Sequence, residues 1–342
     1  MRISLRRVLV LLGLACMVTA GMASDRAWAQ QAAPTAARGV FEHKVVEVDV
    51  PAAAPGQART RPGGITRVEV DNRLGDVRIE GHDRSTIQVS AFKRAADDAT
   101  LDRLRIDLIT DPRGPVRIAT WIAAGENARP IPKGTIRIDL VIRAPRSAAV
   151  RGQVWNDRLE VRSMENGAEL TANDGNIVVE NVTGKVVTQT SAGKQNLLDI
   201  YGSVDAQAMA GDVELVIVHG KRLTATAHDG SIEGRQIRVR EMSLRTTTGD
   251  IRLEGFAVAG GRYRIASYRG NIAVKLGHTG PLSVSATSKR RVTLPSRLAA
   301  RADDSGALVG MLSAVLPGAK DDLPAVIELR SRLGNLQFAV IE

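Results

Sequence analysis

The chain has 342 residues, of which 44% are hydrophobic, 25% are charged and only 3% are aromatic. This balance is ordinary for a globular protein and excludes a long disordered or collagen-like chain. The 32 glycines predict many tight turns, the single cysteine excludes an internal disulfide framework, and the formal net charge is +10.

The first 29 residues have the pattern of a secretory signal peptide. Three arginines precede the apolar run 8–20, and an Ala-Trp-Ala sequence ends at Ala29, so we expect cleavage after that residue. The run is shorter than the roughly 20 residues of a spanning helix. A twin-arginine signal at Arg6-Arg7 and lipidation of Cys16 remain alternatives. We therefore expect an exported protein of the periplasm or cell envelope, whose mature chain has a net charge of +7 and no transmembrane helix.

Residues 30–40 are predicted to be a flexible leader, and residues 41–150 a region of less regular strands. A helical turn is expected at the start of Ala95–Leu104. The strands predicted in this region are Lys44–Val50, Thr66–Val70, Val77–Ile79, Thr86–Phe92, Leu104–Ile109, Val116–Ile122 and Thr135–Ile142.

An internal repeat organises the next part of the chain. Its turn glycines follow one another at spacings of 18, 18, 19, 19 and 21 residues, and each has a small residue three positions before it. The glycines are Gly175, Gly193, Gly211, Gly230, Gly249 and Gly270. A second set, Gly184, Gly202 and Gly220, lies nine residues further on and predicts a second turn in each repeat. Apolar residues two apart point to one face of a strand, so each repeat reads as two short strands.

One such unit cannot bury its own apolar face, whereas stacked units bury a continuous aliphatic column. We predict an all-β fold, a right-handed parallel β-helix or β-solenoid with coils of about 18–20 residues over residues 151–288. Less regular β caps are expected at 41–150 and 289–342, the latter with strands at Ala325–Leu329 and Leu336–Ile341. Gly306–Val315 is expected to be a short helix or capping loop, and a β-sandwich of antiparallel hairpins is the alternative fold.

These patterns match a known family. The run Val68–Ile79, the strand Ile138–Pro145 ending in Ala-Pro, and the serial Gly-Asp/Asn-aliphatic turns resemble the bacterial putative-adhesin family, also called LiaG-like. The resemblance covers approximately residues 45–340. It implies a right-handed β-helical, non-catalytic envelope protein of unknown function, and it carries no catalytic residues over to this chain.

The sequence contains none of the common nucleotide-binding, metalloprotease or serine-hydrolase motifs, and its five histidines are scattered. We therefore assign no catalytic residue, cofactor or metal, and expect that the protein is not an enzyme. Acid–base cleavage of a polysaccharide needs paired carboxylates. The aligned turn column has no two neighbouring acidic residues, which favours a role in turn formation; it reads Asn176, Lys194, Asp212, Ser231, Asp250 and Asn271.

Two groups of residues are candidates for binding. The turn edge aligns His228, Thr247 and Tyr268 in a row that predicts a shallow glycan strip. The stretch 235–291 carries twelve basic and three acidic residues, and arginine suits phosphate and carboxylate partners. The candidates for an anionic-surface site are Arg238, Arg240, Arg245, Arg262, Arg264, Arg269, Arg290 and Arg291.

Three functional classes are compatible with the sequence. The first is an exported, non-catalytic envelope scaffold or adhesin-like binding module that contacts an anionic envelope polymer, lipopolysaccharide or another envelope protein. The second is a carbohydrate-active β-helix enzyme, a polysaccharide lyase or hydrolase. The third is a surface adhesin that recognises a host or neighbouring cell. Nucleic acid is not expected as a partner, since aromatic residues are not interleaved with the basic ones.

Overall fold

A computed structural model describes residues 2–3, 39–49, 66–110, 114–124, 131, 134–278, 280–295, 301–302, 312–316 and 323–341. The predicted apolar run 8–20, Cys16, the cleavage site at Ala29 and nearly all of the leader 30–40 lie outside the described residues. The chain divides into two compact units, residues 1–158 and 159–342. Both are built of β-strands, so the all-β prediction is confirmed.

The first unit contains nine strands and one short helix among its described residues. They are β1 (Arg2–Ile3), β2 (Val40–Asp49), β3 (Arg67–Asn72), β4 (Val77–His82), β5 (Thr86–Ala95), α2 (Asp98–Leu101), β6 (Leu104–Ile109), β7 (Val116–Ile122), β8 (Arg137–Pro145) and β9 (Ala149–Val154). The predicted helical turn is α2, whose first turn is capped because Asp97 accepts a hydrogen bond from the Thr100 N–H.

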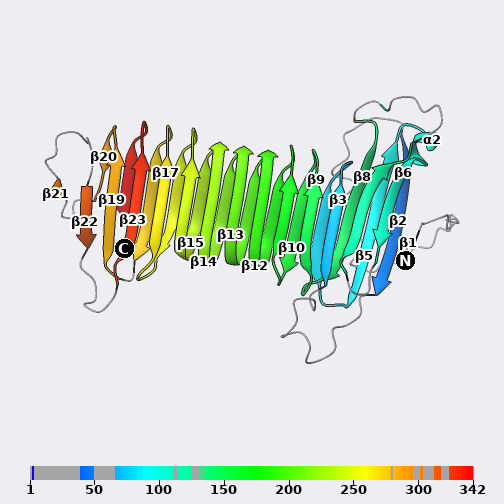
Figure 1. Cartoon of the computed structure of the whole chain (residues 1–342), viewed down its shortest axis with the longest axis horizontal. Coiled ribbons are helices and arrows are strands. Elements are labelled where there is room, and N and C mark those ends of the chain that lie inside the picture. Colours follow the sequence, from blue (N-terminus) through cyan, green and yellow to red (C-terminus); the bar gives the residue numbers. More distant parts are fainter. Residues whose placement is uncertain are drawn as a thin grey trace. The chain divides into compact units, whose positions relative to one another are not determined.

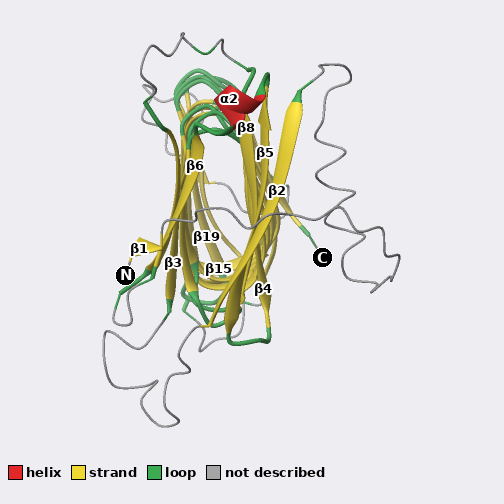
Figure 2. Cartoon of the chain, turned by 90° about the vertical axis from the view of Figure 1, so that its right-hand side faces the viewer, coloured by secondary structure: helices red, strands yellow, loops and turns green. Residues whose placement is uncertain are grey.

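The strands of the first unit form two groups. In one, β2 and β8 flank β5 in antiparallel pairing, and β4 pairs with β8 in parallel. In the other, β6 pairs antiparallel with β7, and β3 pairs in parallel with both β7 and β9. Figure 2 shows β6 and β3 on one side and β8, β5 and β2 on the other. Alternate residues are buried along β4 and β5, which is the pattern of strands with one face on a core.

In the described part of the second unit, all regular secondary structure is β-strand. They are β10 (Leu159–Met164), β11 (Ala168–Ala172), β12 (Ile177–Ala192), β13 (Gln195–Ala210), β14 (Val213–Asp229), β15 (Ile232–Thr246), β16 (Ile251–Ala257), β17 (Arg262–Ser267), β18 (Ile272–His278), β19 (Leu282–Ser288), β20 (Val292–Thr293), β21 (Arg301–Ala302), β22 (Leu312–Leu316), β23 (Ala325–Ser331) and β24 (Leu336–Val340).

The repeats of the second unit stack in parallel, one coil on the next (Figure 1, green to yellow). Ile177 pairs with Gln195, Gln195 with Val213, and Val213 with Ile232, which is the alignment that the turn glycines predict. The parallel register between β12 and β18 contradicts the alternative of antiparallel hairpins there.

Each coil bends at a residue with left-handed backbone instead of breaking at a second turn. Asn181, Asp199, Ile217 and Gln236 have φ values of 53 to 57°, and β12 to β15 run through these bends as single strands of 15 to 17 residues. Gly184 has the positive φ, 107°, that its predicted turn requires, but it lies inside the continuous strand β12 and does not end it. A further bend lies three residues earlier, at Asn181, whose residue type tolerates this conformation; the equivalent Ile217 belongs to a type that rarely adopts it.

The bend separates the two halves of each coil, which pack against each other across a narrow core. The first halves carry Glu214 and Arg235 on their outer side, and we call this surface the strand-one face; the second halves carry Thr224 and Arg245 on theirs, and we call it the strand-two face. Gln195 shows that the halves meet, because its buried side chain bonds with Thr188 and Thr190 at 2.6 and 2.9 Å. Most other buried side chains are aliphatic, as the low aromatic content predicts.

The C-terminal strands enter the stack out of sequence order. Strand β23 pairs in parallel with β17 on one side and β19 on the other, and β24 lies between β18 and β20 (Figure 1, red). Of the segment predicted as a helix or capping loop, residues 312–315 belong to strand β22, which pairs antiparallel with β19; residues 306–311 lie outside the described residues.

Candidate binding groove

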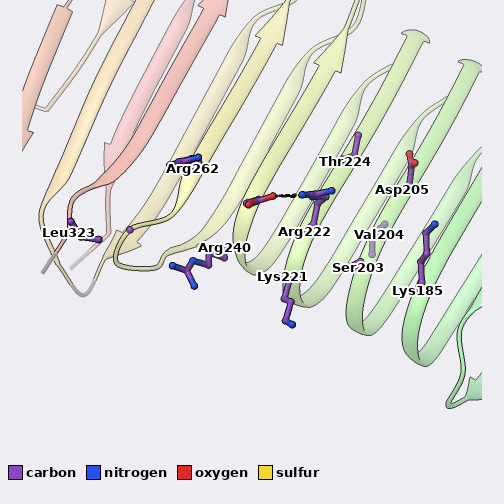
Figure 3. A pocket seen from close by; sticks show the side chains of 12 residues that line it. Lys185, Ser203, Val204, Asp205, Lys221, Arg222, Thr224, Arg240, Arg262 and Leu323 are labelled. Atoms are coloured by element: carbon purple, nitrogen blue, oxygen red, sulfur yellow. Dashed lines mark hydrogen bonds and ion pairs between the residues drawn. The ribbon is translucent and has the colours of Figure 1, made fainter. Parts of the chain in front are cut away.

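An open groove of about 900 Å³ runs along the strand-two side of the second unit, close to the bends of the coils. Figure 3 shows its lining side chains following one another on successive coils. The lining residues are Lys185, Ser203, Val204, Asp205, Lys221, Arg222, Thr224, Arg240, Glu241, Gly260, Arg262 and Leu323.

The parallel register explains why basic residues gather here. Arg222 pairs with Glu241 on the next coil, and Glu241 pairs with Arg262 on the coil after that. Because equivalent positions of stacked coils lie about 4.8 Å apart, a charge recurring at one repeat position becomes a row across the coils. The groove is thus a product of the repeat, like the hydrophobic core beneath it.

The groove is electropositive. Five of its lining residues are basic and two are acidic. Within the groove, the carboxylate of Glu241 accepts a hydrogen bond of 2.8 Å from the guanidinium of Arg222. That pair is mostly exposed and contributes little to stability. The other cations make no ion pair with any residue that the structure describes; they are Lys185, Lys221, Arg240 and Arg262. Within the described ranges, no carboxylate neutralises these four charges.

A buried tyrosine fixes the chain beside the groove. The Tyr263 hydroxyl donates to the Val239 carbonyl at 2.9 Å and accepts from the Val258 N–H at 2.8 Å. Burial raises the pKa of this phenol, so it stays a neutral donor. These bonds hold the backbone next to Arg240 and Arg262, which reduces the freedom of two groove cations.

The eight predicted arginines are all exposed, but they do not form one surface. Arg240 and Arg262 line the groove, and Arg264 lines an adjoining hollow, where it pairs with Glu328 at 3.3 Å. Arg245 lies on the strand-two face away from this lining, and Arg238 lies two residues after the bend at Gln236, also outside the lining. Arg269, Arg290 and Arg291 lie at turns between strands.

The sequence reasoning missed three cations of the groove. Lys185, Lys221 and Arg222 lie before the basic stretch 235–291, so counting charge along the chain left them out. The signal that could have found them is the repeat itself, since Lys185, Lys221 and Arg240 each lie one residue after the position of Gly184, Gly220 or Val239 in the alignment.

The three residues of the predicted glycan strip lie next to one another, in one row across successive coils. The hydroxyl of Thr247 lies 3.2 Å from His228 Nδ1, and the Arg269 N–H beside Tyr268 bonds to the Thr247 carbonyl. The guanidinium of Arg332 lies 5.1 Å from the centre of the Tyr268 ring, so one ring face is already covered. The row lies at the turn edge and contributes no residue to the groove.

The turn column has a structural role. Oδ1 atoms of Asn176, Asp212, Asp250 and Asn271 each accept from the backbone N–H of the equivalent residue on the next coil, at 2.7 to 2.9 Å. Buried hydroxyls add a second column: Ser267 donates to the Gly249 carbonyl and accepts from the Gly270 N–H. The turn carboxylates and amides are therefore engaged in joining coils.

The first unit contains a charged cluster that the sequence analysis did not assign. Arg137 contacts Asp76 and Asp139 at 2.7 Å and Asp157 at 3.4 Å, and all four side chains are less than a quarter exposed. Burial raises the pKa of Asp139 and of Asp157, and Arg137 opposes both shifts. Burial lowers the pKa of Arg137, the carboxylates raise it, and the net direction is upward. The cluster is a buried ion network.

Two properties of the described residues bear on the site. In the described parts of the chain, no three or more His, Cys, Asp or Glu side chains are grouped so that they could hold a metal ion. Within the same ranges, no helix has the length and hydrophobicity needed to cross a membrane.

Comparison with known proteins settles the family. The sequence model of the Toastrack DUF4097 family matches residues 130–305, which is more than half of the chain. The protein belongs to the Toastrack family. Membership confirms the predicted resemblance to an adhesin-like family of β-strand-repeat proteins of unknown function. None of the curated proteins searched matches this Toastrack chain.

Several solved structures are similar to this Toastrack protein over most of its length. A putative adhesin from Bacteroides fragilis is 11% identical, with 88% of this chain and 97% of that chain covered and a TM-score of 0.38. A putative lipid binding protein from Parabacteroides distasonis is 10% identical, with the same coverages and a TM-score of 0.35. A putative cell adhesion protein from Clostridium sporogenes is 10% identical, with 88% and 100% covered and a TM-score of 0.26.

Proposed function

We propose that the protein is an exported, non-catalytic binding module of the bacterial cell envelope, and that its groove holds an anionic ligand. The proposal rests on four groove cations that have no ion-pair partner among the described residues. Export is supported by the signal-peptide pattern ending at Ala29. An envelope polymer, lipopolysaccharide or an acidic envelope protein would supply the negative charge.

The architecture proposed with this function is a right-handed coil, the hand that nearly all parallel crossover connections adopt. Regions 41–150 and 289–342 are proposed as its caps, which would protect strand edges from pairing with other chains. In this reading the coil stack is a scaffold, and the groove is the part that recognises a ligand.

Binding to anionic surfaces tests the proposal. Wild type is compared with the double variant Arg240→Gln/Arg262→Gln for binding to phosphatidylglycerol vesicles, lipopolysaccharide and immobilised polygalacturonate. The groove variant should bind at least one of these probes less tightly, and salt should weaken wild-type binding. The matched control is Arg238→Gln/Lys275→Gln, which removes the same charge from exposed positions outside the groove lining that make no ion pair with the described residues. An equal loss in both variants would show that net charge, not the groove, carries the binding.

The alternative is a polysaccharide lyase or hydrolase, which would need two working carboxylates in the groove. Asp205 and Glu241 are the acidic lining residues, and Glu241 is already ion-paired with Arg222. We expect no product when the chain is incubated with anionic polysaccharides. Release of reducing ends that disappears in Asp205→Asn or Glu241→Gln would replace the proposal with the enzymatic one.

A further inference from the structure

The cations of the groove are ordered along the direction in which the coils stack. They come in turn from β12 (Lys185), β14 (Lys221 and Arg222), β15 (Arg240) and β17 (Arg262). Strands β12, β13, β14, β15 and β17 pair consecutively. Since paired strands lie about 4.8 Å apart, the row spans four coil steps, or about 19 Å. A ligand that met all of these charges would have to be extended across the coils.

Polar groups of a different kind lie among the cations. Ser203 and Thr224 bring hydroxyls to the lining, and Asp205 brings a carboxylate that is half-buried and can only accept hydrogen bonds when ionised. A polymer that offers charged groups alone, such as polyphosphate, would place negative groups against Asp205 and Glu241 without donors for them. A polymer that combines spaced carboxylates with hydroxyls offers donors to Asp205 and anions to the arginines.

We propose that the groove binds an acidic polysaccharide of the uronate class, whose chain runs across the coils from Lys185 to Arg262. This inference rests on the proposed function, since it names the ligand of that same groove. The carboxylates pair with Arg240 and Arg262, because the planar guanidinium matches a carboxylate in two parallel hydrogen bonds. The ring hydroxyls donate to Asp205 and exchange hydrogen bonds with Thr224.

The order of the groove cations along the coil stack distinguishes a linear ligand from a membrane surface. A lipid surface presents headgroups over an area and needs no particular order of cations along the stack. A linear chain gains a new contact with each coil it crosses, until it reaches the end of the row. Affinity for a linear ligand should therefore depend on its length, with a limit near the 19 Å span estimated from the strand spacing.

The test is a calorimetric titration of the full chain with oligogalacturonides, from dimers through octamers, at low salt. The expected affinity rises with length and levels off once the oligomer spans the groove. Arg240→Gln/Arg262→Gln should weaken octamer binding by about tenfold or more, because charge-assisted hydrogen bonds are lost. The control Arg238→Gln/Lys275→Gln, outside the groove lining, should stay within about twofold of wild type. Circular dichroism verifies that both variants are folded.

Four results would overturn the inference. They are equal affinity for dimer and octamer, equal affinity for fully methyl-esterified oligomers, tighter binding of polyphosphate of matched length, and octamer binding that is unaffected by the groove variant. If the groove variant loses binding to phosphatidylglycerol vesicles while no oligogalacturonide binds, the polysaccharide inference fails and the anionic groove stands. If no vesicle, lipopolysaccharide or polyanion binding depends on the groove, both fail.

Discussion

Asp250 accepts a hydrogen bond on Oδ1 from the backbone N–H of Asn271, 2.8 Å away on the next coil of the stack. The contact joins two turns at a point where no strand pairing is available. It repeats along the column wherever the turn residue carries an Asp or Asn side chain, as at Asn176 and Asp212. The Asp and Asn of this repeat therefore cap a neighbouring coil, in the way that a side chain caps the first turn of a helix.

Replacing Asp250 with alanine should lower the free energy of unfolding by about 1 kcal/mol, because the Asn271 N–H loses its acceptor. Asp250→Asn keeps the Oδ1 and should restore most of that loss. Ser231→Ala is the control, since the Ser231 side chain makes no such bond with the described residues. Chemical denaturation measures all three, and equal stability of the alanine and asparagine variants at position 250 would contradict the capping role.

The turn glycines are required by the close approach of successive coils. A Cβ added to Gly249 would lie 1.9 Å from the Gly230 carbonyl oxygen, and neither backbone can move without disturbing the coils on both sides. Gly249→Ala should cost about 2 kcal/mol of stability. In the matched variant Gly277→Ala, the three atoms nearest to the new Cβ all belong to the ring of Phe256, which is exposed and can turn away. Thermal unfolding should therefore show a much smaller loss for Gly277→Ala.

Ile217 is strained, because it holds a φ of 56° and a β-branched residue is disfavoured there. The equivalent position on an earlier coil is Asn181, a residue type that tolerates this conformation. Ile217→Asn should raise the free energy of unfolding by about 1 kcal/mol, and Asn181→Ile should lower it by a similar amount. Denaturant titration of both variants is the measurement, and a destabilised Ile217→Asn would show that the packing of the isoleucine outweighs its strain.

The buried cluster around Arg137 predicts a pH dependence. Burial raises the pKa of Asp157, so the folded state holds this proton to a higher pH than the unfolded chain does. The stability due to that proton is fully present below the unfolded pKa and is lost as the pH rises through the folded pKa. In Asp157→Asn this loss should be absent, so the variant should gain stability relative to wild type as the pH rises from about 4. Asp102→Asn, at an exposed carboxylate, is the control, and parallel pH curves for wild type and Asp157→Asn would refute the prediction.

The sequence predicted the repeat well because each turn needs a glycine, a small residue and a polar residue at fixed spacing. That pattern placed Ile177, Gln195 and Val213 in one register, as the strand pairing shows. The bends escaped prediction, since Ile217 has no turn propensity and its backbone is imposed by the coils above and below. The Arg137 cluster escaped it too, because its carboxylates come from residues 76, 139 and 157, and only pairing between distant strands brings them together.

The groove was only half predictable for a similar reason. Arg240 and Arg262 belong to a run of basic residues that composition reveals, whereas Lys185 and Arg222 become their neighbours only through stacking. Asp205 gave no signal in the sequence, since its place among the cations depends on which coil face it occupies. In a repeat protein, the residues of one binding site are therefore found more reliably by comparing equivalent positions of the repeats than by following the chain.

The insertion of β23 between β17 and β19 has a consequence for how the chain assembles. Coils over residues 177–278 can stack in the order in which they are synthesised. The coil of residues 282–293 cannot stack on the rest of the array until residues 325–340 have been made. That later segment lies between this coil and the coil before it, since β24 pairs with β18 and with β20. A later segment of the chain thus completes an inner layer. A chain cut short before residue 325 would lack a layer from within the stack and would leave β17 and β19 without their shared partner.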